Sequence, residues 1–181
     1  MFPSSAKWRT NAILQSGVVR ARRAKESDNL RERDIRRDMQ ISRVTDSAAI
    51  RGPAEYFTGT VWLTEVTKAP YVSDARVFLV TFEPAARTAW HTHPHGQVLH
   101  VLSGVGRVCR EGGKPVDVHP GAVISFEAGE RHWHGAAPGG VMAHLAVQRA
   151  DADGSTATWL EHVSDAEYAC DGDPARGANV Q

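Results

Sequence analysis

From Met39 onward, apolar and polar residues alternate in short runs that are separated by turn-forming residues. Gly and Pro occur between the runs, for example at Pro94 and Gly96 and again at Pro120 and Gly121. Short runs that recur every roughly 8–12 residues, without intervening helical patterns, predict an all-β sandwich or closed barrel. The predicted strands are Gln40–Val44, Gly59–Val66, Ala75–Phe82, Thr88–His93, Gln97–Leu102, Gly106–Arg110, Pro115–His119, Ala122–Phe126, Arg131–Ala136 and Val141–Gln148.

A short helix is expected after the strands, over Ser164–Ala169. Ser164 and Glu167 have the spacing of a capping box, in which each side chain accepts a hydrogen bond from the backbone N–H of the other residue. Residues 171–181 follow Cys170 with small and polar residues and no apolar pattern. We expect them to form a flexible tail.

Composition and charge describe an ordinary globular protein. The 181 residues are enough for one domain with its own core, and 41% of them are hydrophobic against 23% charged. Lys and Arg balance Asp and Glu at 21 each, which gives no reason to expect binding to nucleic acid or to a membrane. The 2 cysteines, Cys109 and Cys170, are too few for a disulfide framework, so a cytoplasmic location is expected.

The first 38 residues differ from the rest of the chain. They carry ten Lys or Arg against five Asp or Glu and have few large apolar residues. A basic arm and a targeting peptide are possible interpretations, but the segment lacks the apolar stretch of a secretory signal and contains acidic residues. We therefore interpret residues 1–38 as a disordered basic extension, or as the product of a start codon placed upstream of Met39.

All nine histidines lie between residues 91 and 162, and four of them form two His-x-His pairs. His91 and His93 share one predicted strand, His132 and His134 share another, and alternate residues of a strand point to the same face. Two such pairs in one barrel indicate a metal site, to which Gln97 can add an oxygen. Nitrogen and oxygen ligands without thiolate suit Mn, Fe, Co, Ni or Zn.

The alternative interpretation of the two pairs is a set of solvent-facing polar strands. Large apolar residues that we expect in the barrel core flank the histidines, and this favours a position inside the barrel. The flanking residues are Trp90, Val98, Leu99, Phe126 and Trp133.

The two histidine blocks resemble the paired motifs of the cupin superfamily. Two positions depart from the common cupin pattern: Gln97 stands where most cupins have Glu, and Glu127 takes the place of a Pro. Within the cupins, the chain from Gly52 to Tyr168 resembles the small manganese-dependent bacterial hydroxynitrile lyases, in which Gln is the normal fourth ligand. The matching stretches are Tyr56–Gly59, Thr81–Pro94, Gly129–Pro138, His144–Gln148 and Trp159–Val163.

This resemblance implies a single-domain jelly-roll barrel over residues 39–170 and a role for each matching residue. It implies a metal centre, with Mn²⁺ as the expected ion, ligated by His91, His93, Gln97 and His132. It implies His144 as the catalytic acid and base, with His134, next to the metal without binding it, as a second catalytic residue. It implies a substrate pocket that includes Phe82, Thr88 and Gln148. It also implies a homo-oligomer, either a dimer or a tetramer.

Three functions are compatible with these features. The resemblance favours a metal-dependent lyase that splits cyanohydrins such as mandelonitrile, a small-molecule substrate, into an aldehyde and hydrogen cyanide. The same ligands also suit an iron-dependent dioxygenase, which would consume oxygen. The third is a non-catalytic module that binds a metal or a small ligand, although such a module has little need for a second imidazole such as His144 near the metal.

Overall fold

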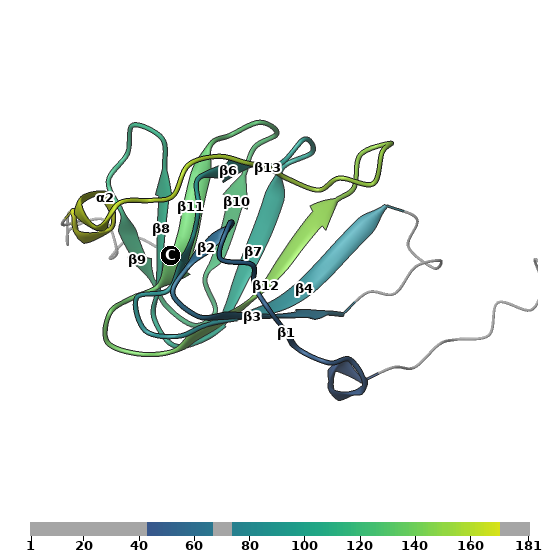
Figure 1. Ribbon diagram of the computed structural model, residues 1–181, viewed down its shortest axis with the longest axis horizontal. Helices are drawn as coiled ribbons and strands as arrows, with labels where there is room; N and C mark the ends of the chain where they lie inside the picture. The colour runs from purple at the N-terminus through teal and green to yellow at the C-terminus, as the bar shows by residue number, and fades with distance from the viewer. Residues whose placement is uncertain (1–42, 67–73, 171–181) are drawn as a thin grey trace, which may run out of the picture. The chain divides into compact units, whose positions relative to one another are not determined.

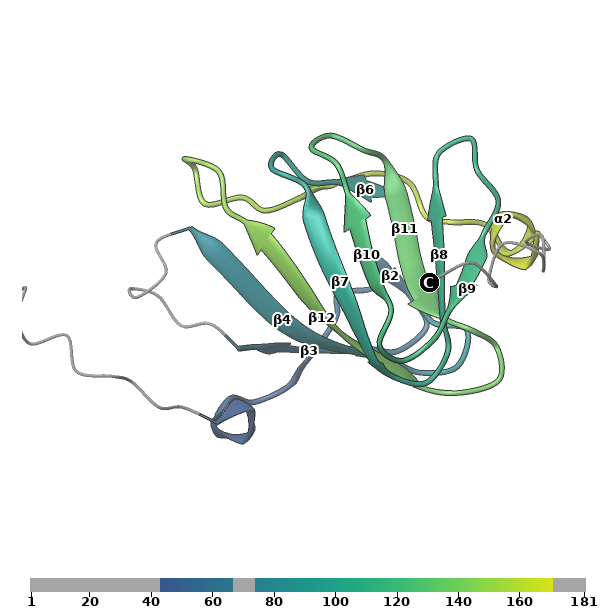
Figure 2. The ribbon, with the colours of Figure 1, turned by 180° about the vertical axis from the view of Figure 1, so that it is seen from behind.

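The computed structural model describes residues 43–66 and 74–170, which form two antiparallel sheets packed face to face (Figure 1). Figure 2 shows four strands of the six-stranded sheet, β4, β12, β7 and β10, side by side in that order. The six-stranded sheet has the order β1 (Ile50–Arg51), β3 (Val61–Glu65), β4 (Ala75–Phe82), β12 (Met142–Arg149), β7 (Gln97–Ser103) and β10 (Val123–Phe126).

The second sheet is built mostly from shorter strands around β11. Its continuous path is β13 (Thr158–Trp159), β6 (His91–Thr92), β11 (His132–Ala136), β5 (Arg87–Thr88) and β2 (Phe57–Thr58). β8 (Gly106–Arg110) pairs with β11, and β9 (Val116–Val118) pairs with β8. A 3₁₀ turn, η1 (Val44–Asp46), precedes the strands, and the helix α2 (Asp165–Ala169) follows them.

The predicted all-β fold with one short C-terminal helix is confirmed. β4 and β8 have the predicted bounds, and α2 begins after Ser164 with the expected capping box, in which the Ser164 hydroxyl accepts from the backbone N–H of Glu167. Of the predicted strand Gln40–Val44, the described part is not a strand, because Val44 begins η1. The predicted extension (residues 1–38), the residues up to 42 and the predicted tail (171–181) lie outside the described residues.

The six-stranded sheet alternates between buried and exposed side chains as a half-buried sheet should. Along β7 the side chains of Gln97, Leu99 and Val101 are buried, while Val98 is exposed. The expectation that Val98 belongs to the core is therefore wrong, because the sheet turns its odd-numbered residues in β7 inward. Leu99 and Val101 join an interior cluster that includes Phe82 and Met142.

The predicted strand Thr88–His93 is in fact two strands with a break at Ala89 and Trp90. β5 pairs with β2, whereas β6 pairs with β13, so the chain changes partners between them. The break also changes which residues face inward: Thr88 and His91, an odd number of residues apart, both line the same cavity. An unbroken strand would have placed them on opposite faces.

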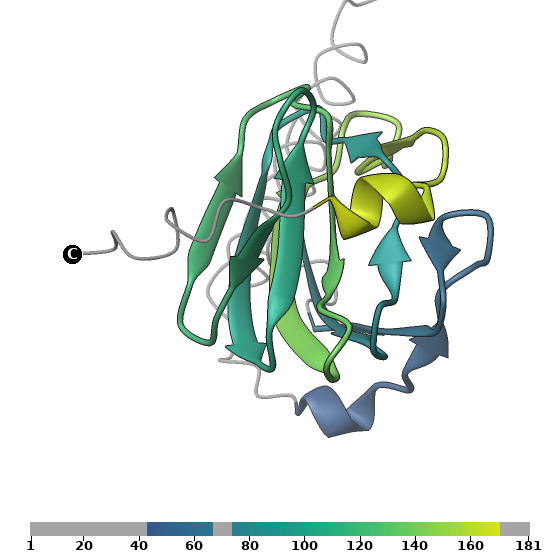
Figure 3. The ribbon, with the colours of Figure 1, turned by 90° about the vertical axis from the view of Figure 1, so that its left-hand side faces the viewer.

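A second, smaller core lies between the outer side of β11 and the C-terminal segment, on the side that Figure 3 presents with α2. Trp133 is fully buried there and packs against Trp90 and Tyr168. The guanidinium of Arg87 lies over the Tyr168 ring and donates to the carbonyl of Val163. The C-terminal segment is thereby fixed against the sheet that carries the histidines.

Within residues 43–66 and 74–170, no helix is both long and apolar enough to span a bilayer.

Candidate metal centre

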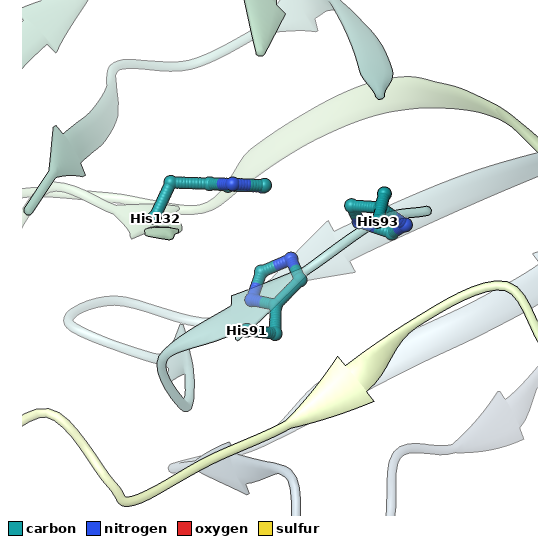
Figure 4. Close-up of side chains that lie close together, drawn as sticks. All are labelled: His91, His93 and His132. Carbon is teal, nitrogen blue, oxygen red and sulfur yellow. The ribbon is translucent and has the colours of Figure 1, made fainter. Parts of the chain in front are cut away.

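Three of the predicted ligands lie together inside the barrel. His91 comes from β6, His93 follows that strand, and His132 begins β11 directly opposite His91 in the strand register. One ring nitrogen from each of the three lies within 4.8 Å of the other two (Figure 4). All three side chains are buried. The paired His-x-His spacing thus brings three imidazoles to one point, as a metal site requires.

Backbone carbonyls fix the orientation of these rings. Nδ1 of His91 donates to the carbonyl of Ala89 at 3.0 Å, and Nδ1 of His132 donates to that of Glu130 at 2.8 Å. His93 makes the same kind of bond, at 2.6 Å, to the carbonyl of Thr156. A carbonyl only accepts, so each Nδ1 carries the hydrogen and each Nε2 keeps a free lone pair. Histidines that bind metals are oriented in this way.

Gln97, the predicted fourth ligand, lies beside these histidines with its side-chain oxygen facing His132. Gly96 has a φ of 77°, which suits glycine, and a Cβ there would lie 2.7 Å from the carbonyl oxygen of Phe126. This tight turn starts β7 with Gln97 facing inward, and its Oε1 lies 3.1 Å from Nε2 of His132. Two acceptor atoms then face each other with no hydrogen between them, an arrangement that a cation beside them would stabilise.

Burial keeps the three clustered histidines neutral. Burial lowers the pKa of His132 to about 4. Burial, and then the nearby His132 and His93, lower the pKa of His91 well below the ordinary 6.5. Burial also lowers the pKa of His93, whose buried Nε2 has no hydrogen-bond partner. Neutral imidazoles with unprotonated Nε2 atoms and an amide oxygen form a donor set that fits a divalent ion.

His134 and His144 form a second imidazole group beside the first. His134 lies two residues after His132 in β11, and His144 points inward from β12. Nδ1 of His134 and Nε2 of His144 are 3.3 Å apart, and their other nitrogens are buried without a partner. Burial lowers the pKa of His144 to about 4 and that of His134 well below 6.5. Both rings pack against Phe82.

A cavity of about 270 Å³ opens beside the histidines. His91, His93, Gln97 and His134 contribute polar groups to its lining, and the rest of the lining is largely aromatic and aliphatic. Of the predicted pocket residues, Thr88 and Gln148 line it, whereas Phe82 does not and instead lies behind His134 in the core. The largely apolar side consists of Pro53, Tyr56, Phe57, Leu63, Phe78, Val80, Ala146, Thr156, Ala157 and Trp159.

Two aromatic residues of the cavity, Tyr56 and Trp159, have no role predicted from the sequence pattern. Their rings stack at 4.7 Å, and Trp159 also lies 4.7 Å from the His91 ring. Both residues stand in stretches that match the hydroxynitrile lyases, so the resemblance contained a signal that they matter. The structure places both rings in the cavity wall, with Trp159 next to the predicted ligand His91.

The fold and site define a class: a β-barrel protein with a buried three-histidine, one-glutamine centre at the edge of an apolar cavity. Comparison with known proteins agrees. A cupin domain model matches residues 78–147. A protein called (R)-mandelonitrile lyase, from Granulicella tundricola, is 51% identical over 130 residues, which are 72% of this chain and 98% of the relative. The chain therefore belongs to the cupin family.

Solved structures support the same fold. A cupin-like protein from Thermotoga maritima is 33% identical, with a TM-score of 0.62 over 72% of this chain and 95% of the other. The polyketide cyclase RemF from Streptomyces resistomycificus is 22% identical, with a TM-score of 0.56 over 72% of this chain and 91% of the other. At that identity the second likeness concerns the fold alone.

Proposed function

We propose that this chain is a metal-dependent lyase that cleaves and forms cyanohydrins such as mandelonitrile. The observation that carries the proposal is the 51% identity to a mandelonitrile lyase over nearly the whole length of that relative. The cavity supports it, because a largely apolar space of about 270 Å³ beside paired imidazoles suits a small aromatic cyanohydrin.

Cleavage of a cyanohydrin needs one proton removed and one returned. The hydroxyl loses its proton, the carbon–oxygen double bond forms, and the carbon–cyanide bond breaks with its electron pair on cyanide. Cyanide then takes a proton and leaves as hydrogen cyanide. One group that is neutral near pH 7 can do both tasks in turn.

His134 and His144 suit this cycle. When Nδ1 of His134 donates to Nε2 of His144, Nε2 of His134 is unprotonated and accepts the substrate proton. Nε2 of His134 then returns a proton to cyanide. His134 lines the cavity, whereas His144 is not among the lining residues and contacts Nδ1 of His134. We therefore assign proton transfer at the substrate to His134, and the setting of its tautomer to His144.

The remaining residues bind and orient. His91, His93, Gln97 and His132 would hold the metal, which when bound supplies positive charge that stabilises an oxygen losing its proton. All four ligands are neutral, so none of that charge is cancelled. The Thr88 hydroxyl accepts from the backbone N–H of His134 at 3.1 Å and holds β11 in place. Manganese as the ion and self-association into a dimer or tetramer stay predictions.

The test is a metal analysis of the purified protein followed by a mandelonitrile cleavage assay that records benzaldehyde. We expect about one divalent ion per chain and cleavage that stops when a chelator removes it. An oxygen electrode in the same assay separates the lyase from the dioxygenase. Oxygen uptake with a phenolic or thiol substrate, without benzaldehyde release from mandelonitrile, would contradict the proposal.

A further inference from the structure

Gln148 is the direct cross-strand neighbour of Gln97. The two residues are paired in the register of β12 and β7, and both side chains point into the barrel. Nε2 of Gln97 donates to Oε1 of Gln148 at 3.0 Å, in a buried position. This bond accounts for the nitrogen end of the Gln97 amide, whose oxygen end faces His132.

A 180° flip of a glutamine side-chain amide exchanges the positions of its oxygen and nitrogen atoms. At Gln97 this exchange decides whether an acceptor or a donor faces the three histidines. Nε2 of His132 is an acceptor, because its Nδ1 hydrogen is donated to Glu130. In the absence of a cation, a turned Gln97 amide would therefore gain a hydrogen bond to His132. Something has to oppose that turn if the oxygen is to stay available.

Gln148 opposes it. A turned Gln97 would place its Oε1 against Oε1 of Gln148, and two facing acceptors in a buried site are costly. The turn becomes favourable only when Gln148 turns as well and offers its own nitrogen. The two amides therefore turn together or not at all, so the orientation of Gln97 is coupled to that of Gln148.

We propose that Gln148 is a positioning residue that keeps the oxygen, rather than the nitrogen, of the Gln97 amide facing His91, His93 and His132. The resemblance to the hydroxynitrile lyases placed Gln148 in the substrate pocket, and it does line the cavity. Its hydrogen bond nevertheless goes to Gln97. The proposal rests on the metal site of the proposed function but not on the reaction.

The experiment titrates metal-free protein with Mn²⁺ alone, by calorimetry, in the absence of any cyanohydrin. Gln148→Leu has a similar volume and no acceptor, so its affinity for Mn²⁺ should fall by about 10–100-fold, as for other outer partners of metal ligands. Gln148→Glu only accepts and forces Gln97 to present its oxygen, so its affinity should equal or exceed that of the parent. Val147→Ala, on the outer face of the same strand, serves as the matched control and should bind like the parent.

A double-mutant cycle isolates the coupling. Once Gln97→Leu has removed the amide, adding Gln148→Leu should have no further effect on Mn²⁺ affinity. Parent affinity in Gln148→Leu would overturn the proposal, and so would equal losses in Gln148→Leu and Gln148→Glu. If Gln148→Leu does not fold, a loss of affinity in Gln148→Glu alone overturns it.

Kinetics separate positioning from substrate contact. A raised KM for mandelonitrile in Gln148→Leu with unchanged Mn²⁺ affinity would make Gln148 a substrate contact and overturn the proposal. Because the titration contains no substrate, a protein that binds Mn²⁺ as expected but does not cleave mandelonitrile contradicts the proposed function only.

Discussion

The barrel interior holds two groups of imidazoles, each with one member on β11. The groups differ in the hydrogen-bond partners of their ring nitrogens. In His91, His93 and His132, Nδ1 donates to a backbone carbonyl, so Nε2 is held as a lone pair facing the cluster. In His134 and His144 the rings bond to each other, and a hydrogen can sit on either side of that bond. The first arrangement fixes the protonation pattern, and the second leaves it exchangeable.

The comparison teaches that residue type and burial do not decide the role of a histidine here. His132 and His134 are two residues apart on β11, and both are buried. Nδ1 of His132 donates to the carbonyl of Glu130, whereas Nδ1 of His134 contacts the imidazole of His144. A metal ligand needs one fixed donor atom, while an acid–base group needs a proton that can come and go. The following predictions test this difference.

The largest effect is expected when a ligand of the fixed group is removed. His91→Ala and His132→Ala should fold but bind metal more weakly than the parent. Their loss of affinity should exceed the factor of about 10–100 that is typical when a residue that orients a ligand is removed, and they should not cleave cyanohydrins. Metal content by elemental analysis, together with the circular dichroism spectrum, checks this. His100→Ala, on the exposed side of β7, is the control. Full metal occupancy in both variants would contradict the assignment of His91 and His132 as metal ligands.

Loss of either member of the exchangeable group should leave the metal in place. His134→Ala and His144→Ala should retain parent metal content but lose about 10²–10⁴-fold in kcat, the usual contribution of a positioned acid or base. The loss should be at least as large for His134, which lines the cavity. Rates and metal content are measured on the same samples at one pH. If both variants cleave mandelonitrile at the parent rate, the pair is only a buried structural contact.

The smallest effect concerns the stability of the metal-free protein against pH. Unfolded histidines have pKa values near 6.5, whereas burial lowers those of His132 and His144 to about 4. The unfolded state therefore binds more protons as the pH falls from 6.5 toward 4. The free energy of unfolding should be greatest above pH 6.5 and should fall below it by about 1.4 kcal/mol per pH unit for each such histidine.

Urea unfolding of metal-free protein at pH 7.5 and pH 5 measures this slope. His144→Gln stays uncharged at both values, so its stability should differ less between them than that of the parent. Equal stability of the parent at pH 7.5 and pH 5 would show that the buried histidines take up protons without cost in the folded state.

Much of the fold could be predicted because alternation and turn residues are local signals. The long strands, such as Ala75–Phe82, repeat the alternation often enough to be seen. β1, β2 and β13 have two residues each, which is too short for any periodicity. The break before His91 arises because the chain changes pairing partners, and such a change depends on tertiary structure.

The candidate site was predictable in its residues but not in its connections. The His-x-His spacing brought out His91, His93 and His132, which the structure places together. The carbonyl of Thr156, which accepts from His93, has no side-chain signal at all. Which of His134 and His144 lines the cavity also depends on packing, since both rings pack against Phe82.

The position of Trp159 has a practical consequence. The chain has five tryptophans, and among those in residues 43–66 and 74–170 Trp159 lines the cavity. Its ring lies 4.7 Å from that of His91. Indole emission is quenched by paramagnetic ions at close range, whereas diamagnetic ions such as Zn²⁺ lack this effect. An ion held by His91 would lie near this ring, so intrinsic fluorescence would report when the proposed centre fills and whether the ion has unpaired electrons.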